Sequence, residues 1–247
     1  MKPTISVIVP ALNEEDNIEP AVNEVISALD GRFSDYELLV FDDGSTDNTG
    51  AIIDRLAAND KNVRAIHNEN NMGLGYSYKK GVQLAKNDYI VMFPGDNQIL
   101  KDSMTRIFDM IGRADIVIPY IENYWVRPLS RQLISKSFTT VMNLLFRLNL
   151  HYYNGTVIHK REIIQPMPID TDGFTYQAEI LTKLIKSGHG YVEVGVPICE
   201  RECGFSKAFH LKNIGRVCWS IVSLFWEFQF KSHGANHKSV QKSDAAK

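Results

Sequence analysis

Two adjacent carboxylates, Asp42 and Asp43, are the clearest chemical signal in this sequence. They follow directly on an apolar run over residues 38–41 and precede a glycine and a serine. A short apolar run bounded by polar residues is typical of a strand buried on both faces. The carboxylates therefore stand at the carboxyl end of a strand, where open α/β sheets bind their ligands. Helix capping is the alternative role, and it accounts for one carboxylate but not for two.

A third carboxylate, Asp96, follows a second apolar run over residues 89–93, in the segment PGDNQ that begins at Pro94. Oxygen ligands of this kind are the ones that Mg²⁺ and Mn²⁺ prefer. The alternative is an Asp that only caps the turn beside Gly95. Upstream, the segment GLG at residues 73–75 precedes a helical pattern, and its backbone N–H groups would cradle a phosphate or simply allow tight packing.

The elements that position these residues alternate along the chain. Strands are expected at residues 5–10, 38–41, 63–67, 89–93 and 116–120, with helices at about 13–29, 49–58, 72–85 and 102–111 between them. This alternation predicts an α/β fold with a mostly parallel sheet flanked by helices. Further helices are expected over 130–150, 175–186 and 213–230, and further strands at 156–159 and 191–197. The polar tail 231–247 lacks periodicity and is predicted to be disordered.

Composition excludes several classes of protein. The 247 residues are 44% hydrophobic and 23% charged, which is ordinary for one large globular domain or two small ones. A net charge of −2 excludes a globally basic nucleic-acid binder, so no nucleic-acid partner is expected. Three cysteines do not make a disulfide framework and are predicted to be reduced thiols in a cytosolic protein. No segment offers the roughly 20 apolar residues of a transmembrane helix, and the first apolar run is too short for a signal peptide.

Charge is distributed unevenly. Residues 123–161 contain no Asp or Glu but six basic residues, namely Arg127, Arg131, Lys136, Arg147, Lys160 and Arg161. One face is therefore expected to meet anions, either phosphates or a lipid headgroup layer. The helices at 130–150 and 213–230 add aromatic residues such as Trp219 and Trp226, which is typical of helices at a membrane surface. Core packing or an oligomer interface, as in a homodimer, is the alternative.

Together these motifs resemble the nucleotide-binding signature of family 2 glycosyltransferases, which have the GT-A fold. The resemblance is carried in order by ISVIVPALNEEDNI from Ile5, YELLVFDDGSTDNT from Tyr36, NNMGLGYSYKKG from Asn70, FPGDNQ from Phe93 and EVGVPICERECGFSK from Glu193. It extends to about Lys207. The likeness is strongest to the dolichyl-phosphate mannose synthase branch, whose members load a sugar onto a polyprenyl phosphate.

The resemblance implies one GT-A domain over residues 1–230, with a nucleotide-sugar half at 1–120 and an acceptor half with amphipathic helices at 121–230. In the donor half, Asp43 would accept a hydrogen bond from the base, and Asp42 would hold the turn or touch the ribose. The other residues that the resemblance assigns to the nucleotide are Pro10, Asn13, Glu14, Asn71, Gly73 and Gly75, with Arg201 and Lys207 on a lid over the diphosphate. Helix capping by Asn13 and a solvated Arg201–Lys207 pair are the alternatives.

The resemblance also assigns a metal site and catalytic residues. Asp96 would bind Mg²⁺ or Mn²⁺ with help from Gln98, although Pro94 replaces the first Asp of the family's D-x-D motif. With one carboxylate fewer, the ion is expected to bind together with the nucleotide. Arg131 falls where the branch carries an arginine near the acceptor phosphate, and His151 replaces an Asp and is a candidate base. Glu179 would face the sugar or acceptor, unless it is a solvent-exposed helical Glu.

The expected activity is an inverting sugar transfer from a UDP- or GDP-sugar to a polyprenyl phosphate, by a protein bound peripherally at the inner, cytoplasmic face of the membrane. A phosphate monoester has a second pKa of about 6 and needs no strong base, which fits the loss of the Asp at position 151. The alternatives are transfer to a saccharide or protein hydroxyl, and a homologue that binds nucleotide-sugar without turnover. A dinucleotide-binding oxidoreductase is a distant third because no G-x-G-x-x-G follows the first strand.

Overall fold

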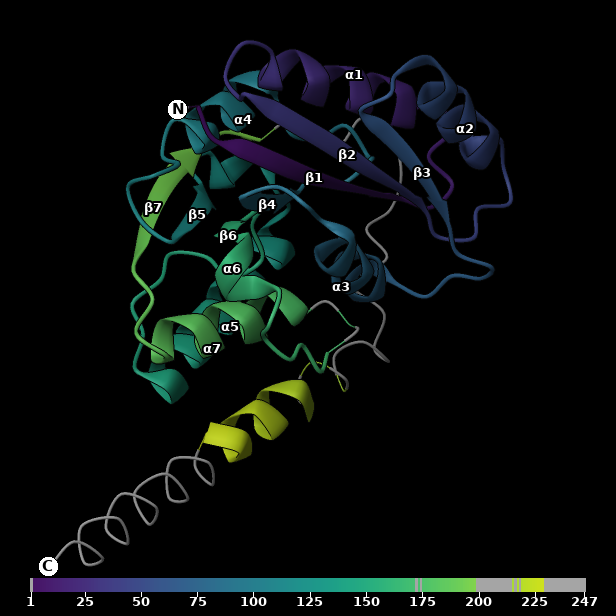
Figure 1. Ribbon diagram of the computed structural model, residues 1–247. Coiled ribbons are helices and arrows are strands. Elements are labelled where there is room, and N and C mark those ends of the chain that lie inside the picture. Colours follow the sequence, from purple (N-terminus) through teal and green to yellow (C-terminus); the bar gives the residue numbers. More distant parts are fainter. Residues whose placement is uncertain are drawn as a thin grey trace, which may run out of the picture.

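The computed structural model describes residues 2–171, 173, 175–198, 215, 217 and 219–228. Its centre is a seven-stranded sheet in the order β3-β2-β1-β4-β6-β5-β7 (Figure 1). The strands are β1 (Thr4–Ala11), β2 (Asp35–Asp42), β3 (Val63–His67), β4 (Tyr89–Met92), β5 (Ile116–Ile121), β6 (Ile158–Lys160) and β7 (Tyr191–Val196). All neighbouring strands pair in parallel except β6, which is antiparallel to β4 and β5. The predicted mostly parallel α/β sheet is confirmed.

Helices cover both faces of the sheet. The helices are α1 (Ile18–Leu29), α2 (Thr49–Asn59), α3 (Leu74–Leu84), α4 (Lys101–Phe108), α5 (Leu129–Phe146), α6 (Arg161–Ile164) and α7 (Tyr176–Lys186), with a 3₁₀ turn η1 (Tyr124–Val126) before α5. Helices α1, α2 and α4 contribute to one hydrophobic cluster, and α3, α5, α6 and α7 contribute to the other. Because the two clusters lie on opposite faces of the strands, this is a three-layer arrangement.

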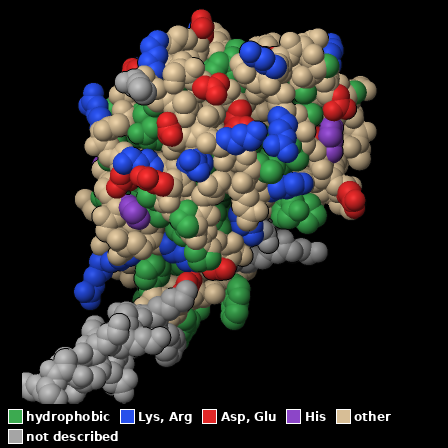
Figure 2. Space-filling model, in the orientation of Figure 1, with side chains coloured by type: hydrophobic (Ala, Val, Ile, Leu, Met, Phe, Trp, Pro, Cys, Tyr) green, Lys and Arg blue, Asp and Glu red, His purple; other side chains and the backbone are tan. Residues whose placement is uncertain are grey.

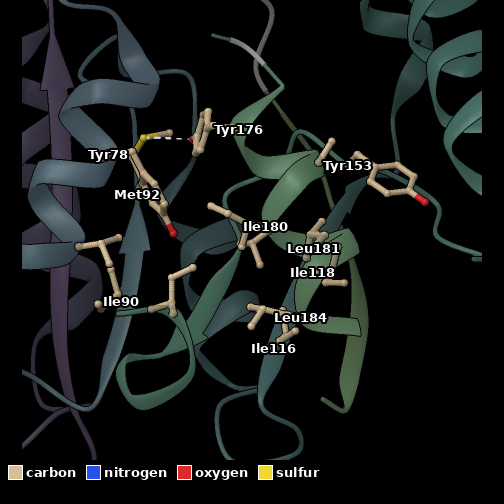
Figure 3. Packing of buried hydrophobic residues seen from close by; sticks show 14 of the residues in the cluster. Tyr78, Ile90, Met92, Ile116, Ile118, Tyr153, Tyr176, Ile180, Leu181 and Leu184 are labelled. Carbon is tan, nitrogen blue, oxygen red and sulfur yellow. Dashed lines mark hydrogen bonds between the residues drawn. The ribbon is translucent and has the colours of Figure 1, made fainter. Parts of the chain in front are cut away.

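The central strands are apolar throughout because both of their faces are covered. In β1, the fully buried Ile8 belongs to the cluster of α3 and α7, whereas its neighbours Val7 and Val9 belong to the other cluster. This is the two-residue alternation of a strand with hydrophobic residues at every position. On the α3 and α7 side, Tyr176 donates a hydrogen bond to the sulfur of Met92, with Tyr78 packed beside them (Figure 3).

Two helices begin later than the sequence pattern predicts, in both cases where the chain enters a loop at the end of a strand. Helix α1 starts at Ile18 rather than near residue 13, because Asn13 is in the left-handed region with a φ of 54°. Helix α3 starts at Leu74 rather than at residue 72, since Gly73 has a φ of 92°. These non-helical loops contain Asn13, Glu14, Asn71 and Gly73, which are among the residues predicted to bind the nucleotide.

The helical residues 219–228 lie below α5 and α7 (Figure 1). Phe225 and Phe228 pack edge-on against Phe146 of α5, with ring centroids 6.4 and 5.8 Å away, and Leu224 is buried in the same cluster. None of the helices that the structure describes has the length and apolar character needed to cross a bilayer. The tail predicted to be disordered, and the three cysteines, lie outside the described residues.

The loop from α5 to β6 passes close to strand β5, and this contact predicts the effect of a substitution. A Cβ added to Gly155 would lie 2.6 Å from the backbone oxygen of Pro119. Gly155→Ala should therefore lower the free energy of unfolding by about 1–3 kcal/mol, as overpacking typically does. Urea denaturation measures it. Gly190→Ala is the matched control, because nothing lies within 4 Å of its added Cβ. Equal stability of the two variants would contradict the packing described here.

Candidate active site

The carboxyl end of β1 holds the two predicted carboxylate loops, one on each side. The backbone N–H of Asp43, just after β2, donates to the carbonyl of Ala11 at 2.9 Å. The N–H of Gly95, just after β4, donates to the carbonyl of Pro10 at 3.0 Å. Neighbouring strands lie about 4.8 Å apart, so the backbones of the two loops are separated by roughly 10 Å. Asp43 and Asp96 thus flank a single strand end at the same edge of the sheet.

The loop after β1 is fastened to the loop after β2 by side-chain hydrogen bonds. Asn13 donates its N–H to the Ser45 hydroxyl at 3.0 Å, and its side-chain oxygen accepts from the N–H of Thr46 at 2.9 Å. The N–H of Glu14 donates to the Thr49 hydroxyl at 2.9 Å. Asn13 is therefore not a helix cap but a bridge between the two loops, and Ser45 and Thr49 are site residues that the sequence interpretation missed.

Asp43 organises the segment that leads into α3. Its side chain is buried, and its oxygens accept hydrogen bonds from the Asn68 amide at 2.8 Å and from the N–H groups of Met72 and Gly73 at 3.0 and 2.9 Å. A carboxylate has about four lone-pair positions, so these three donors leave room for one more. The predicted hydrogen bond from a nucleotide base is compatible with that remaining position.

The predicted phosphate-binding segment lies beside this carboxylate. A Cβ added to Gly44 would come within 2.6 Å of the Asn70 backbone carbon, so the turn after Asp43 touches the loop segment at residues 70 and 71. Asn71 is exposed, while Gly75 is buried inside the first turn of α3. Because Gly73 already donates to Asp43, its N–H is engaged within the protein. A phosphate role for Asn71, Gly73 and Gly75 stays a prediction.

Asp42 belongs to a small charged cluster that the sequence interpretation did not identify. His67, the last residue of β3, places one ring nitrogen 3.2 Å from Asp42 and the other 2.9 Å from Asp54 of α2. The hydrogen bond to Asp54 raises the pKa of His67, with Asp42 adding to it against the effect of burial. Burial raises the pKa of Asp42, but hydrogen bonds from Ser45 and His67 outweigh it and hold that pKa below its usual value. The position of His67 at the end of a third parallel strand was the available signal.

Asp96 and Gln98 are adjacent in space as predicted. The Gln98 side-chain amide donates to one Asp96 oxygen, and the left-handed Asn97 between them, with a φ of 53°, makes the turn tight. Within the described ranges, no three His, Cys, Asp or Glu side chains gather into a metal site. One carboxylate and one amide oxygen nevertheless fit Mg²⁺, which commonly takes one or two carboxylates and completes its shell with substrate phosphates and waters.

In the acceptor half, His151 is paired with a carboxylate. Its backbone N–H donates to one oxygen of Glu193 at 2.8 Å, and its Nδ1 lies 2.9 Å from the other. The ring stacks on Tyr120 with centroids 4.7 Å apart. The imidazole is largely exposed while Glu193 is mostly buried. Glu193, on β7, is a partner that the sequence interpretation missed, and it fixes His151 with Nε2 directed away from the carboxylate.

Glu179 is buried and hydrogen-bonded to a loop of the protein, which matches neither of the two roles considered for it. The side chain is 4% exposed, so the expectation of a solvent-exposed helical Glu is wrong. Its oxygens accept from the N–H groups of Asp170 and Thr171 at 2.9 Å each. Lys183 lies 2.7 Å from the same carboxylate and 3.4 Å from Glu227 in the helix 219–228. Glu179 thus anchors the loop before α7, and this arrangement favours a structural role over contact with the sugar or acceptor.

Comparison with known proteins decides the family. The sequence profile described as "Glycosyl transferase family 2" matches residues 6–166. The chain belongs to this glycosyltransferase family. Among characterised relatives, the polyprenol monophosphomannose synthase of Mycolicibacterium smegmatis is 30% identical, over 81% of this chain and 79% of that protein. The undecaprenyl-phosphate mannosyltransferase of Micrococcus luteus is 26% identical over 81% of this chain and 85% of that protein.

Solved structures agree on the fold of this glycosyltransferase. Glucosyl-3-phosphoglycerate synthase from Mycobacterium tuberculosis, in complex with Mg²⁺ and UDP, superposes with a TM-score of 0.66 at 17% identity, covering 91% of this chain and 79% of that one. A complex of the same enzyme with Mn²⁺, UDP and glucosyl-3-phosphoglycerate gives 0.62 at 19% identity, with the same coverage. The predicted GT-A fold is therefore confirmed. Both of these structures contain a divalent metal and UDP.

The structure places most of the predicted donor residues in one region of the glycosyltransferase. Pro10 and Asp42 lie at the carboxyl ends of β1 and β2. The loops that follow β1, β2, β3 and β4 contain Asn13, Glu14, Asp43, Asn71, Gly73, Asp96 and Gln98. Arg131 is half-buried in the first turn of α5. Arg201 and Lys207 lie outside the described residues, so their predicted lid stays untested.

The cluster of His67, Asp42 and Asp54 makes stability depend on pH. Because the pKa of His67 is raised above its ordinary value of 6.5, the stabilisation is complete below that pH and is lost as the pH rises through the folded-state pKa. The difference in free energy of unfolding between the wild type and His67→Gln should thus be largest below pH 6.5 and shrink at higher pH. Urea denaturation across pH 5.5–8.5 measures it.

Asp54→Asn is the matched variant for this test, since it keeps the imidazole but removes its principal carboxylate partner. The pH-dependent part of the stability should then shift to lower pH. A difference between the wild type and His67→Gln that stays constant across the range would show that the histidine is not charged within the cluster.

Proposed function

We propose that this family 2 glycosyltransferase transfers a sugar from a nucleoside-diphosphate sugar to a polyprenyl phosphate at a membrane surface. The observation that carries the proposal is the attachment of the Asp43 and Asp96 loops to consecutive carbonyls of β1. A span of roughly 10 Å between the two loops is suited to a ligand with a base at one end and a diphosphate at the other. One nucleotide would therefore engage both carboxylates.

The donor would lie across the end of β1. Asp43 would accept a hydrogen bond from the base, while Asp42, Pro10, Asn13 and Glu14 shape the pocket for base and ribose. Asp96 and Gln98 would hold Mg²⁺ or Mn²⁺, which when bound neutralises charge on the diphosphate leaving group. Arg201 and Lys207 would add positive charge beside the same group.

Transfer would proceed by in-line displacement with inversion. A phosphate oxygen of the acceptor attacks the anomeric carbon and forms the new C–O bond, while the bond to the diphosphate breaks and its electron pair leaves with the nucleoside diphosphate. The attacking phosphate is already mostly deprotonated near neutral pH, because its second pKa is about 6. Catalysis would then depend on positioning and electrostatics, with His151, held by Glu193, beside the acceptor rather than acting as an obligatory base.

A polyprenyl phosphate is the acceptor that the chain's charge pattern favours. Arg131 lies in the first turn of α5, within a stretch of sequence that contains no Asp or Glu from residue 123 to residue 161. Two relatives are named for polyprenol and undecaprenyl phosphate as acceptors, and the dolichol-phosphate mannosyltransferase of Saccharomyces cerevisiae is 28% identical over 72% of this chain. Their names make mannose the first sugar to test.

The outer surface of α5 and of residues 219–228 favours association with a membrane. Leu129, Leu133 and Leu144 of α5 are 81%, 69% and 74% exposed, and Trp219 and Trp226 are 74% and 53% exposed. Figure 2 shows hydrophobic side chains gathered at the lower end of the molecule, where this helical segment lies in Figure 1. Apolar patches of this kind mark interaction sites, and exposed lysine and arginine beside them suit anionic lipid. The alternative is that this surface forms the interface of a homodimer.

The defining experiment incubates the protein with Mn²⁺ or Mg²⁺ and a panel of UDP- and GDP-sugars, with and without a polyprenyl phosphate. Release of UDP or GDP that requires the lipid phosphate, with a glycosylated lipid as product, is the expected result. Release that instead requires a saccharide or protein hydroxyl would overturn the acceptor assignment. Nucleotide-sugar binding without turnover on any acceptor would identify a non-catalytic homologue.

Asp96→Ala should lower turnover at least about a hundredfold, because the leaving diphosphate loses its principal electrostatic partner. The rate should no longer respond to added Mn²⁺. Asp102→Ala, which removes an exposed carboxylate from the first turn of α4, is the matched control and should retain activity. Near-normal, metal-stimulated turnover by Asp96→Ala would refute the metal assignment.

The double variant Trp219→Ser/Trp226→Ser should bind vesicles containing anionic lipid about tenfold or more weakly, since removal of each exposed indole loses roughly 1 kcal/mol or more of transfer free energy. Co-sedimentation with the vesicles measures the bound fraction. Leu100→Ser, at an exposed apolar residue before α4, is the control and should bind as the wild type does. Unchanged vesicle binding by the double variant would count against this surface.

A further inference from the structure

Arg127 occupies an unusual position just before α5. It follows the turn η1, and its guanidinium lies against Tyr152: Nη1 donates to the Tyr152 hydroxyl at 3.2 Å, and the guanidinium carbon is 5.9 Å from the ring centroid. Tyr124 packs edge-on against Tyr152, and the Tyr124 hydroxyl lies 3.3 Å from the Ser135 hydroxyl on α5. Two aromatic rings therefore fix the orientation of this arginine.

One N–H group of the guanidinium is not satisfied by the protein. Among the residues that the structure describes, Arg127 Nε is the one buried side-chain nitrogen or oxygen without a hydrogen-bond partner. Leaving a buried donor of a charged group without an acceptor destabilises the protein. An arginine held in place with an unused N–H would thus gain a hydrogen bond from a ligand oxygen that reaches this position. The planar guanidinium matches the oxygens of a phosphate better than any other side chain does.

The surroundings of Arg127 select an anion. Arg131 follows in the first turn of α5. It lies on the same side of the helix as Ser135 and Phe138, and all three residues are at least half-buried. Lys136 places its ammonium 5.9 Å from the centroid of the Tyr124 ring. The nearest acidic residue upstream in the sequence, Glu122, is paired with Arg106 at 3.3 Å. A doubly charged phosphate monoester would therefore meet cations here, with no unpaired carboxylate on the adjoining turn.

Apolar residues border the same position on the outside. Trp125, Leu129 and Leu133 recur every four residues on either side of Arg127 and are 77%, 81% and 69% exposed. They face outward, whereas Arg131 and Ser135 lie on the inner side of α5. A free phosphate ion would gain nothing from such apolar neighbours. A phosphate attached to a hydrocarbon chain would place its headgroup inside, against the arginines, and its chain against these side chains.

We propose that Arg127, held by Tyr124 and Tyr152, is a second phosphate-binding arginine that receives the lipid phosphomonoester, with Trp125, Leu129 and Leu133 contacting its chain. The inference rests on the proposed function and deepens it, because it adds a residue and a binding mode for the acceptor. Arg127 would set the position of the attacking phosphate through Nε and the guanidinium nitrogen that does not contact Tyr152.

The test measures binding of farnesyl phosphate to the full chain by calorimetry or by quenching of tryptophan fluorescence, without donor sugar. Farnesol and inorganic phosphate are the separate probes for the chain and the headgroup. We expect farnesyl phosphate to bind more tightly than either, and Arg127→Ala to weaken it about ten- to a hundredfold while leaving farnesol unaffected. Arg113→Ala, which removes an exposed arginine after α4, is the matched control and should leave binding unchanged.

Arg127→Lys keeps the positive charge but not the planar group, so its affinity for farnesyl phosphate should be intermediate between those of the wild type and Arg127→Ala. This variant still tests the proposal if Arg127→Ala does not fold. Nucleoside diphosphate and Mn²⁺ should bind both variants as they bind the wild type, which separates this inference from a failure of the donor site. Wild-type affinity for farnesyl phosphate in both variants would overturn the proposal. The proposal would also be overturned if Arg127→Ala weakened farnesol binding as much as it weakened farnesyl phosphate binding. Equal affinity of the wild type for inorganic phosphate and for farnesyl phosphate would overturn it as well.

Discussion

Two backbone hydrogen bonds at the end of β1 determine how this glycosyltransferase can work. The carbonyls of Pro10 and Ala11 accept from Gly95 and Asp43, so the loops that carry the two principal carboxylates are fixed to neighbouring peptide units of a single strand. Strand β1 is itself central and almost completely buried, with partners on both sides. The spacing of the two loop backbones that carry the carboxylates is thus set by the sheet.

The loops of the donor site hold one another in place. Their polar side chains fix neighbouring backbone, and some of them can also bind a ligand. Asn13 and Asp43 each use their side-chain oxygens to hold neighbouring backbone, and Asp43 retains capacity for one more donor. His67 plays a comparable part on the outer side by bridging Asp42 and Asp54. A nucleotide would meet a pocket whose hydrogen-bonding groups are already oriented, which reduces the ordering that binding requires.

Helix α5 separates two environments in the acceptor half. Its inner stripe, which includes Met142 and Phe146, packs into the core, whereas Leu129, Leu133 and Leu144 are exposed on the outside. The residues 219–228 extend this division, because Leu224 is buried while Trp219 and Trp226 are exposed. Core packing, one of the predicted alternatives, therefore applies to the inner sides of these helices, and the proposed membrane contact would involve their outer sides. An acceptor with a charged head and an apolar chain suits that boundary.

The sequence predicts the strands well because apolar runs such as residues 38–41 must be buried on both faces, and no other arrangement hides them. It also locates Asp42, Asp43 and Asp96, since carboxylates that directly follow such runs lie at one edge of a parallel sheet. The antiparallel insertion of β6 between β4 and β5 could not be predicted, because it depends on pairing between Ile90 and His159, far apart in sequence. The burial of Glu179 was missed because it depends on how the loop at Asp170 and Thr171 folds back to donate its N–H groups, which the helical pattern does not indicate.

The most direct measurement of the central claim compares the binding of a nucleoside and its diphosphate to Asp43→Ala and Asp96→Ala by calorimetry, at several Mn²⁺ concentrations. If both carboxylates contact one nucleotide, Asp43→Ala should weaken the nucleoside and the diphosphate alike. Asp96→Ala should leave the nucleoside unchanged and remove the dependence of diphosphate binding on Mn²⁺. Mn²⁺-dependent binding of the diphosphate to Asp96→Ala with wild-type affinity would show that the two loops do not share a ligand.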